Sequence, residues 1–384
     1  MSSRRRSPAA APPLEDENLL SEILLRLPPQ PSSLPRASAV SKRWRSLVSD
    51  PRFVRRFRIH HRRNPPLLGF FGNEEFVPTM ESPNRVPEGR ISFQREDDDG
   101  HISPLGCRHG LVMFYSSHGQ VLVWDSVHRN KHCLAAPPWF EPCGAVLRSA
   151  KDIQHFQVVL VGTETKEQRH TQAIAHIYSS ETGEWGDFIS KTLPPEYSGD
   201  RGIRRGNVLV GNSLYWSLFS DEPSIIEFDL DRQRLNVIPM PVDINAAERD
   251  TIGSQSMVVR ADGGGLGFLF MSHPDYIVQL WKRTTNCDGI ASWVLGRTIE
   301  LDKLISLNSE EKLFRFVILA YAEYNNVLLL RTVNDLFTVH LESLQVRELF
   351  ENDHFGDYHL FESVYTAGMG IDDGNGGAEL LHNT

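Results

Sequence analysis

Apolar residues near the start of the chain recur at the spacing of a helix. Five of them fall on one stripe of a short helix: Leu19, Leu20, Ile23, Leu24 and Leu27. Asp16 stands where an N-cap residue would, and Glu17 adds negative charge at the positive end of the helix dipole. Pro28 and Pro29 end the helix, because a proline ring offers no backbone N–H to continue it.

Further apolar sets follow at similar spacing. They comprise Leu34, Ala37 and Val40, then Trp44, Leu47 and Val48, and finally Phe53, Val54 and Phe57. Asp50-Pro51 precedes the last set in the order of an N-cap followed by a proline in the first helical turn. The pattern predicts three or four short helices, a unit too small to bury all of these side chains alone. Some of them therefore either pack on the rest of the chain or are available to another protein.

From Leu67 onward the pattern changes to short runs of β-forming residues separated by turn signals. Asn64-Pro65-Pro66 marks the change as a stiff connector, because consecutive prolines restrict the chain to extended conformations. The runs lie about eight to twelve residues apart and continue as far as Phe350. Short strands at this spacing predict an all-antiparallel β domain.

A loose repeat is present within the β-rich part. Gly211–Pro241 contains a strand, a turn, a strand that ends in Asp, another turn and a strand that ends in Pro. His109–Pro138 and Asn325–Leu349 follow the same scheme, the latter without final prolines, and His176–Phe188 fits the last two strands of a further copy. Copies about 45–55 residues apart suit four-stranded blades, and about 300 residues hold roughly six of them. We therefore predict a β-propeller-like domain of about six blades, with a β-sandwich as the alternative.

The composition is that of a soluble globular protein, since 40% of the 384 residues are hydrophobic and 23% are charged. No apolar run approaches the length of a membrane span, and the N-terminus lacks the apolar centre of a signal peptide. Four cysteines in a chain of this length do not indicate a disulfide scaffold. We expect no membrane association and a reducing compartment, the cytosol or the nucleus.

The net charge of −9 hides an asymmetry. Residues 1–63 carry 14 Lys and Arg against 5 Asp and Glu, whereas the remainder carries 26 against 44. A basic start on an acidic body is compatible with nucleic-acid binding or with an acidic protein partner, and the acidic body makes nucleic acid the weaker interpretation. The candidates for steering an acidic partner are Arg52, Arg55, Arg56, Arg58, Arg62 and Arg63.

The residues give little indication of catalysis or metal binding. Neither Cys107 with His109 nor Cys133 with His132 has the paired spacing of a zinc site. Gly263–Gly267 lies between two strand runs and predicts a hairpin turn, because a phosphate-binding loop needs a helix after it. No nucleophile-elbow or metalloprotease motif is present. We therefore predict no catalytic residue, no cofactor and no metal.

The start of the chain resembles the F-box, the module that docks substrate receptors onto the Skp adaptor of SCF-type cullin–RING ubiquitin ligases. The resemblance is carried by LLSEILLRLP at Leu19–Pro28 and by VSKRWRSLVSDPRF at Val40–Phe53, with Leu34 and Arg36 between them. Many F-boxes open with Leu-Pro, whereas Leu14 is followed here by Glu15.

The remaining layout also resembles plant proteins of this class. NPPLLGFF at Asn64–Phe71 is similar to the large F-box families of grasses, and the β-rich part resembles the kelch-like F-box-associated propellers of plants, without a paired-glycine kelch signature. The resulting division is a disordered tail at 1–13, an F-box module at 14–62, a propeller-like domain at 67–367 and a flexible tail at 368–384.

The resemblance implies which side chains contact the adaptor: Leu14, Leu20, Ile23, Leu24, Pro28, Val40, Trp44 and Leu47. It implies a substrate-receptor subunit that performs no bond chemistry itself. Such a subunit binds the Skp adaptor, and through it a cullin–RING ligase, and holds an unidentified protein substrate on its β domain. The alternative is a β-propeller lectin or enzyme with a helical N-terminal appendage.

Overall fold

The structure of the protein is a computed structural model that describes residues 16–72, 75–87, 89–91, 93, 100–126, 129–137, 143–149, 154–166, 170–194, 202–219, 222–241, 255–305, 316–332, 335–351 and 357–366. The described chain divides into two compact units. The head consists of residues 16–66 together with two short segments, 81–85 and 364–366. The propeller comprises the described residues within 67–80 and 86–363. The tails expected at 1–13 and 368–384 lie outside the described residues.

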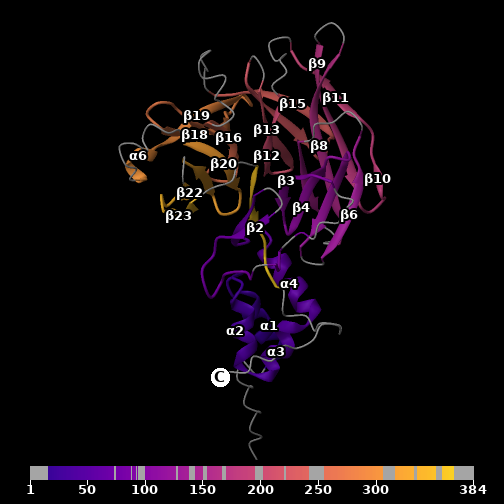
Figure 1. The fold of residues 1–384 in the computed structure, drawn as a ribbon, viewed down its shortest axis with the longest axis vertical. Coiled ribbons are helices and arrows are strands. Elements are labelled where there is room, and N and C mark those ends of the chain that lie inside the picture. The colour runs from indigo at the N-terminus through magenta and orange to yellow at the C-terminus, as the bar shows by residue number, and fades with distance from the viewer. Residues whose placement is uncertain are drawn as a thin grey trace, which may run out of the picture. The chain divides into compact units, whose positions relative to one another are not determined.

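Four helices form the head: α1 (Glu17–Leu25), α2 (Ser33–Val40), α3 (Lys42–Ser49) and α4 (Pro51–His61), drawn in indigo in Figure 1. Three of them begin at a side-chain cap. The carboxylate of Asp16 accepts hydrogen bonds from two backbone N–H groups of the first turn of α1, at 2.9 and 3.1 Å. Ser41 caps α3 in the same way, and Asp50 caps α4 ahead of Pro51. The predicted N-cap at Asp16 and the cap-then-proline start of the last helix are therefore confirmed.

The apolar faces of these helices meet in one core. Its buried members are Leu20, Leu24, Leu25, Leu34, Ala37, Val48, Phe53 and Phe57, together with Val364 from the far end of the described chain. Segment 81–85 is also bound to the head, because the side chain of Asn84 accepts a hydrogen bond from the backbone N–H of Ser32 (3.2 Å). Helices of eight to eleven residues are marginal by themselves, so this tertiary packing supplies most of their stability.

Six antiparallel sheets form the propeller, and each is one blade (Figure 1). Blade 1 contains β3 (Ile102–Arg108), β4 (Leu111–Ser116), β5 (Gln120–Asp125) and β6 (Asn130–Ala135). Blade 2 contains β7 (Cys143–Arg148), β8 (Phe156–Lys166), β9 (His170–Ser179), β10 (Glu184–Trp185) and β11 (Ile189–Thr192). Blade 3 contains β12 (Ile203–Val210), β13 (Ser213–Leu218), β14 (Ser224–Asp229) and β15 (Arg234–Pro239).

In the second half of the ring, blades 4 and 5 are four-stranded and blade 6 has three described strands. Blade 4 contains β16 (Ser256–Arg260), β17 (Leu266–Met271), β18 (Ile277–Thr285) and β19 (Ala291–Glu300), followed by the short helix α6 (Leu301–Leu304). Blade 5 contains β20 (Val317–Ala322), β21 (Val327–Arg331), β22 (Asp335–His340) and β23 (Val346–Glu351). Blade 6 contains β24 (Tyr358–Glu362), β1 (Leu67–Gly72) and β2 (Glu75–Pro78).

The first and last strands of the propeller close the ring. β24 pairs antiparallel with β1, so that Leu67 lies opposite Glu362 and Gly72 lies opposite Tyr358. The inner strands β24, β3, β7, β12, β16 and β20 each contact the next one around the ring. The predicted propeller of about six blades is confirmed, and the β-sandwich alternative is not the fold.

Hydrophobic clusters fill the spaces between neighbouring blades. Successive clusters join blades 1 and 2, 2 and 3, 3 and 4, 4 and 5, and 5 and 6. Trp216 is fully buried between blades 2 and 3, and the ring of Trp124 lies 6.4 Å from that of Phe71 where blade 1 meets blade 6. These tryptophans hold sheets together, as large buried aromatic groups do in most cores.

The structure explains why glycine occupies three of its positions. Gly263 and Gly264 form the predicted hairpin turn between β16 and β17, with φ values of +83° and +84° that favour glycine. Gly144 on β7 is required by a close approach instead. A Cβ atom at this position would lie 2.9 Å from the carbonyl oxygen of Val159 on the neighbouring strand.

Candidate functional site

The side chains of α1 divide between the head core and the surface. Leu20 and Leu24 are fully buried, whereas Leu19 and Ile23, each one position earlier, are 43% and 38% exposed. Both pairs recur at four-residue spacing, so they form two neighbouring stripes along the helix. Leu20 and Leu24 hold α1 to the head, and Leu19 and Ile23 face away from its core.

This division changes the role expected for part of the adaptor-contact set. Leu20 and Leu24 belong to the core, so within this fold their side chains support the outer surface of α1 and do not form it. The sequence pattern merged the two stripes, because adjacent helix positions differ by only about 100° around the axis. Leu19 was part of the predicted stripe but not of the expected contact set, although it shares the exposed side of α1 with Ile23.

The other expected contact residues also occupy different environments. Pro28 is exposed, and Val40 at the end of α2 is 62% exposed. Trp44 and Leu47 are half-buried and pack against the head core. Leu14 lies outside the described residues. The exposed apolar residues of the expected set are therefore Ile23, Pro28 and Val40, whereas Trp44 and Leu47 are partly covered by the core.

The basic side chains of α4 are partly engaged within the head. Arg56 donates to the carboxylate of Glu22 on α1 (2.6 Å), and Arg58 donates through Nε to the hydroxyl of Thr366 (2.8 Å). Arg52 is exposed at the start of the helix. Steering of an acidic partner by the α4 arginines stays a prediction.

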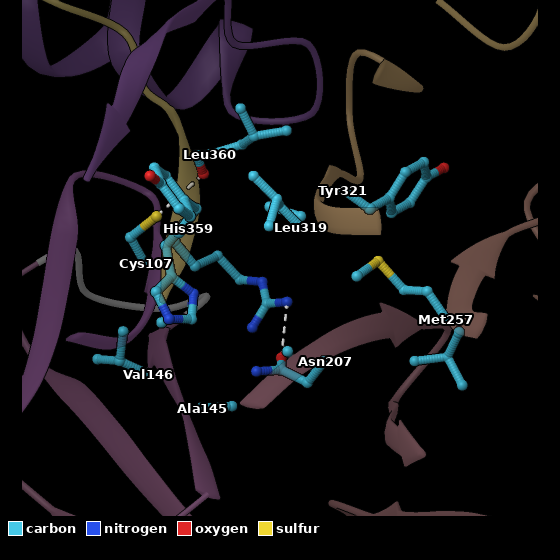
Figure 2. A pocket seen from close by; sticks show the side chains of 15 residues that line it. Cys107, Ala145, Val146, Asn207, Met257, Leu319, Tyr321, His359 and Leu360 are labelled. Atoms are coloured by element: carbon cyan, nitrogen blue, oxygen red, sulfur yellow. Dashed lines mark hydrogen bonds between the residues drawn. The ribbon is translucent and has the colours of Figure 1, made fainter. Parts of the chain in front are cut away.

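The propeller has a narrow cavity on its axis, lined by inner strands of all six blades. Figure 2 shows the side chains around it: Cys107, Ala145, Val146, Asn207, Met257, Leu319, Tyr321, His359 and Leu360. The cavity volume is about 50 Å³. Sites for small molecules typically measure about 300–1,000 Å³, so this space matches about one or two water molecules and not a sugar or a cofactor.

A buried ion pair lies beside this cavity. Arg108 at the end of β3 donates through Nε to Oε1 of Glu323 (2.7 Å) and through Nη2 to Oε2 (2.8 Å). Nη2 also donates to Oδ1 of Asn207 on β12 (3.0 Å), the dashed line beside Asn207 in Figure 2. Burial alone would lower the pKa of the Arg108 guanidinium, but the charge and hydrogen bonds of Glu323 outweigh burial and raise it. The arginine therefore stays protonated and links blades 1, 3 and 5.

Burial raises the pKa of two other groups near the axis, and so favours their neutral forms. Burial, with the charge of Glu362, raises the pKa of the Cys107 thiol well above its ordinary range, and the thiol donates to the carbonyl of Leu360 (3.0 Å). This thiol is therefore poorly suited to nucleophilic or metal chemistry. Burial also raises the pKa of Glu362 to about 7. Its carboxylate accepts hydrogen bonds from the backbone N–H groups of Tyr324 (3.0 Å) and Asn325 (2.7 Å).

The residues considered for zinc make other contacts. Nε2 of His109 lies 2.8 Å from the hydroxyl of Tyr324, and Cys133 is exposed on β6. Across the described ranges, no group of three or more His, Cys, Asp or Glu residues could hold a metal ion. In the same part of the chain, no helix is long and apolar enough to cross a bilayer.

Comparisons with known proteins agree with this architecture. Residues 16–56 match the F-box domain, so the protein is an F-box protein with a six-bladed β-propeller. Residues 105–365 match the family described as F-box protein AT5G49610-like, beta-propeller. The chain belongs to this family, which confirms the resemblance to plant F-box proteins with a propeller.

Similar proteins come from Arabidopsis thaliana. One, named as the F-box protein At3g16210, is 25% identical over 230 residues, which are 59% of this chain and 60% of that protein. The F-box/LRR-repeat protein At2g43260 is 23% identical over 323 residues, 77% of this chain and 70% of that protein. The match thus spans less than two thirds of the length of the first relative. The solved β-propeller domain of Cps50 (Swd1) shares 10% identity with a TM-score of 0.34 over 64% of this chain and 70% of that one, a likeness too low to bear on function.

Proposed function

We propose that the protein is the substrate-receptor subunit of an SCF-type cullin–RING ubiquitin ligase. The observation that carries this proposal is the combination of an F-box head with a closed six-bladed propeller in one chain. F-box proteins with a propeller are in general non-catalytic adaptors. Their contribution to ubiquitin transfer is proximity, because a bound substrate is held near the ubiquitin-charged partner of the ligase.

The head supplies the contact with a Skp-type adaptor. The exposed apolar residues that we assign to this contact are Leu19 and Ile23 on α1, together with Pro28 and Val40. Buried Leu20 and Leu24 fix the orientation of α1, so the surface is presented by a packed helix and needs little rearrangement to bind. Basic residues of α4 add attraction for an acidic adaptor, which acts mainly on the association rate.

The propeller supplies the contact with a protein substrate. The small volume of its axial cavity disfavours the alternative of a lectin or a small-molecule enzyme at that position. A protein substrate instead meets outer surfaces that the scaffold holds rigid. A nucleic-acid partner is not part of the proposal, and the place of action we propose is the cytosol, the nucleus or both.

Reconstitution with a purified Skp-type adaptor tests the proposal. The full chain should bind the adaptor in a calorimetric titration, and Ile23→Asp should weaken binding at least about tenfold, since it places a charge in an apolar contact. Phe188→Asp is the matched control, because Phe188 is an equally exposed apolar residue of the propeller, at 42% against 38%.

A second readout follows the ligase itself. With a cullin–RING complex and ubiquitin-charging enzymes added, the wild-type chain should acquire ubiquitin, and Ile23→Asp should reduce this modification in proportion to its lost binding. A chain that does not bind the adaptor at micromolar concentration, or whose binding is unaffected by Ile23→Asp, contradicts the proposal.

A further inference from the structure

Exposed apolar side chains of the propeller gather on one hairpin. Among its described residues, the large apolar side chains that remain exposed are Phe188, Ile290, Val294 and Leu295. Three of these four belong to the hairpin of β18 and β19 in blade 4, with exposures of 64%, 51% and 43% for Ile290, Val294 and Leu295. Such clustering marks an interaction surface more often than single exposed residues do.

The hairpin extends past the rest of its blade. β17 pairs with β18 only as far as Gly267 opposite Lys282, whereas β18 and β19 continue to pair as far as Thr285 opposite Ala291. β19 is ten residues long, and no described strand pairs with its outer edge. The backbone N–H and C=O groups along that edge are therefore available to another strand.

Two other outer strands, β15 and β23, carry residues that discourage strand pairing. β15 has Arg234 at its start and Pro239 at its end, and β23 has Arg347 and Glu348 in its middle. Charges and prolines of this kind protect sheet edges from association. In β19 the segment from Ala291 to Gly296 has no charge and no proline, so its apolar edge lacks this protection.

The edge is held in a fixed shape. The indole N–H of Trp293 donates to the carbonyl of Pro239 in blade 3 (3.0 Å), and the guanidinium of Arg283 lies 5.6 Å from the centre of the Trp293 ring. At the tip, the side chain of Asn286 accepts hydrogen bonds from the backbone N–H groups of Asp288 (3.0 Å) and Ile290 (2.8 Å). A preformed edge loses little conformational entropy when a strand is added.

The charges beside the apolar edge are positive. In the strand register Lys282 lies opposite Val294 and Arg283 lies opposite Trp293, which places one cation on each face of the hairpin. The acidic residues of the hairpin are Asp288 at its tip and Glu300 at its far end, away from this segment. A partner strand with several acidic side chains therefore fits this surface better than a second copy of the chain, whose β19 carries one carboxylate, that of Glu300.

We infer that the outer edge of β19 binds an extended acidic segment of a protein substrate as an added β-strand. Backbone hydrogen bonds along Ala291–Gly296 supply the pairing. Val294 and Leu295 point to opposite faces of the sheet, so each contacts a side chain on its own face of the added strand. Lys282 and Arg283 lie on β18, one strand further in than β19, and attract the acidic residues at longer range. This inference rests on the proposed function, because it assigns the substrate surface of the same receptor.

Peptide binding to the full chain tests the inference directly. The probe is a fluorescein-labelled peptide, Asp-Glu-Val-Thr-Val-Thr-Val-Glu-Asp, followed by fluorescence anisotropy. We expect saturable binding that weakens at least tenfold when lysine replaces the four acidic residues, and that is lost when proline replaces the central valine and the threonine after it. The proline peptide is decisive, since it retains every charge, and one of two consecutive prolines removes an N–H that faces β19 in either orientation of the peptide.

Variants of the chain locate the binding surface. Val294→Lys should weaken binding of the acidic peptide at least tenfold, and Leu295→Lys is the second variant should the first alter the fold as judged by circular dichroism. Phe188→Lys is the control and should bind the peptide as the wild-type chain does. Failure of the acidic peptide to bind, equal binding of the proline peptide, or unchanged binding by both lysine variants overturns the inference.

Two further measurements distinguish substrate binding at this edge from adaptor binding and from self-association. The lysine variants should bind the Skp-type adaptor as the wild-type chain does, so a failed peptide experiment with intact adaptor binding overturns this inference and leaves the proposed function standing. Sedimentation velocity of the chain alone should show a monomer. A dimer that Val294→Lys dissociates would identify the occupant of the edge as a second copy and overturn the assignment to an acidic substrate segment.

Discussion

Arg108 and Glu323 form a buried ion pair between blades 1 and 5 of the propeller, with Nε and Oε1 2.7 Å apart. The two residues are 215 positions apart in the sequence and come from blades 1 and 5. Both side chains are nearly completely buried, and Asn207 from blade 3 shares the guanidinium. The pair therefore links three blades through charged groups that water does not screen.

Removal of one partner of this pair should be strongly destabilising. Glu323→Ala leaves the Arg108 charge buried without its partner, which costs about 3–5 kcal/mol in the free energy of unfolding of the propeller. The control is Arg232→Ala, which removes the exposed pair between Arg232 and Asp229 and should cost less than about 1 kcal/mol. Urea unfolding followed by tryptophan fluorescence measures both. Equal midpoints for the two variants would mean that the buried pair contributes no more than a surface pair.

The stability of the head should depend on the inner stripe of α1. Leu24→Ala removes a fully buried side chain and should cost about 2–5 kcal/mol, whereas Ile23→Ala should change the free energy of unfolding by less than about 1 kcal/mol. Trp44→Ala should fall between them, because Trp44 is half-buried against the same core. Thermal melting of the full chain, followed by circular dichroism, ranks the three variants by their loss of stability. A larger loss for Ile23→Ala than for Leu24→Ala would place the core on the other stripe.

The segment that follows β24 should stabilise the head. Val364 is buried in the head core, so Val364→Ala should cost about 2 kcal/mol through lost apolar burial. Thr366→Val, which removes the acceptor for Arg58, should cost about 1 kcal/mol. Hydrogen exchange of the α1 and α4 amides localises these losses. Unchanged protection in Val364→Ala would show that residues 16–66 fold without this contribution.

The stability of the propeller should fall as pH rises towards neutral, in part because of Glu362. Its pKa is raised from 4.5 to about 7, chiefly by burial, so between these values the native state binds more protons than the unfolded state. The free energy of unfolding therefore decreases through this window, and the penalty is fully present above a pH of about 7. Glu362→Gln carries no charge and should make the decrease shallower. Urea midpoints at several pH values test this, and parallel curves for the two proteins would contradict it.

Much of the local structure could be predicted from the sequence. The cap at Asp16, the start of α4 at Asp50-Pro51 and the turn at Gly263 depend on hydrogen bonds and backbone angles within a few residues, which the residue types themselves specify. The F-box motif and the blade repeat follow from the same local patterns, repeated along the chain. These features could therefore be predicted without knowing which distant residues are in contact.

Several strands were not among the predicted runs, for a physical reason. β3 contains Pro104 and Gly106, and β24 carries His359 and Glu362, so neither reads as an alternating apolar strand. Both lie on the axis, where close strands and buried polar partners replace the usual packing of one apolar face. β19 was missed for a different reason, since most of its residues are exposed.

The tertiary structure alone decided which residues meet. Leu19 and Leu20 are adjacent and equally apolar, and only the packing of α4 and Val364 against α1 places one outside and the other in the core. Periodicity specifies that a helix has an apolar side, but it does not resolve neighbouring stripes on a short helix. The pairing of Leu67 with Glu362 and the contact of Arg108 with Glu323 likewise join residues far apart in the chain. Such contacts depend on closure of the whole ring, and the local pattern of residues does not encode that closure.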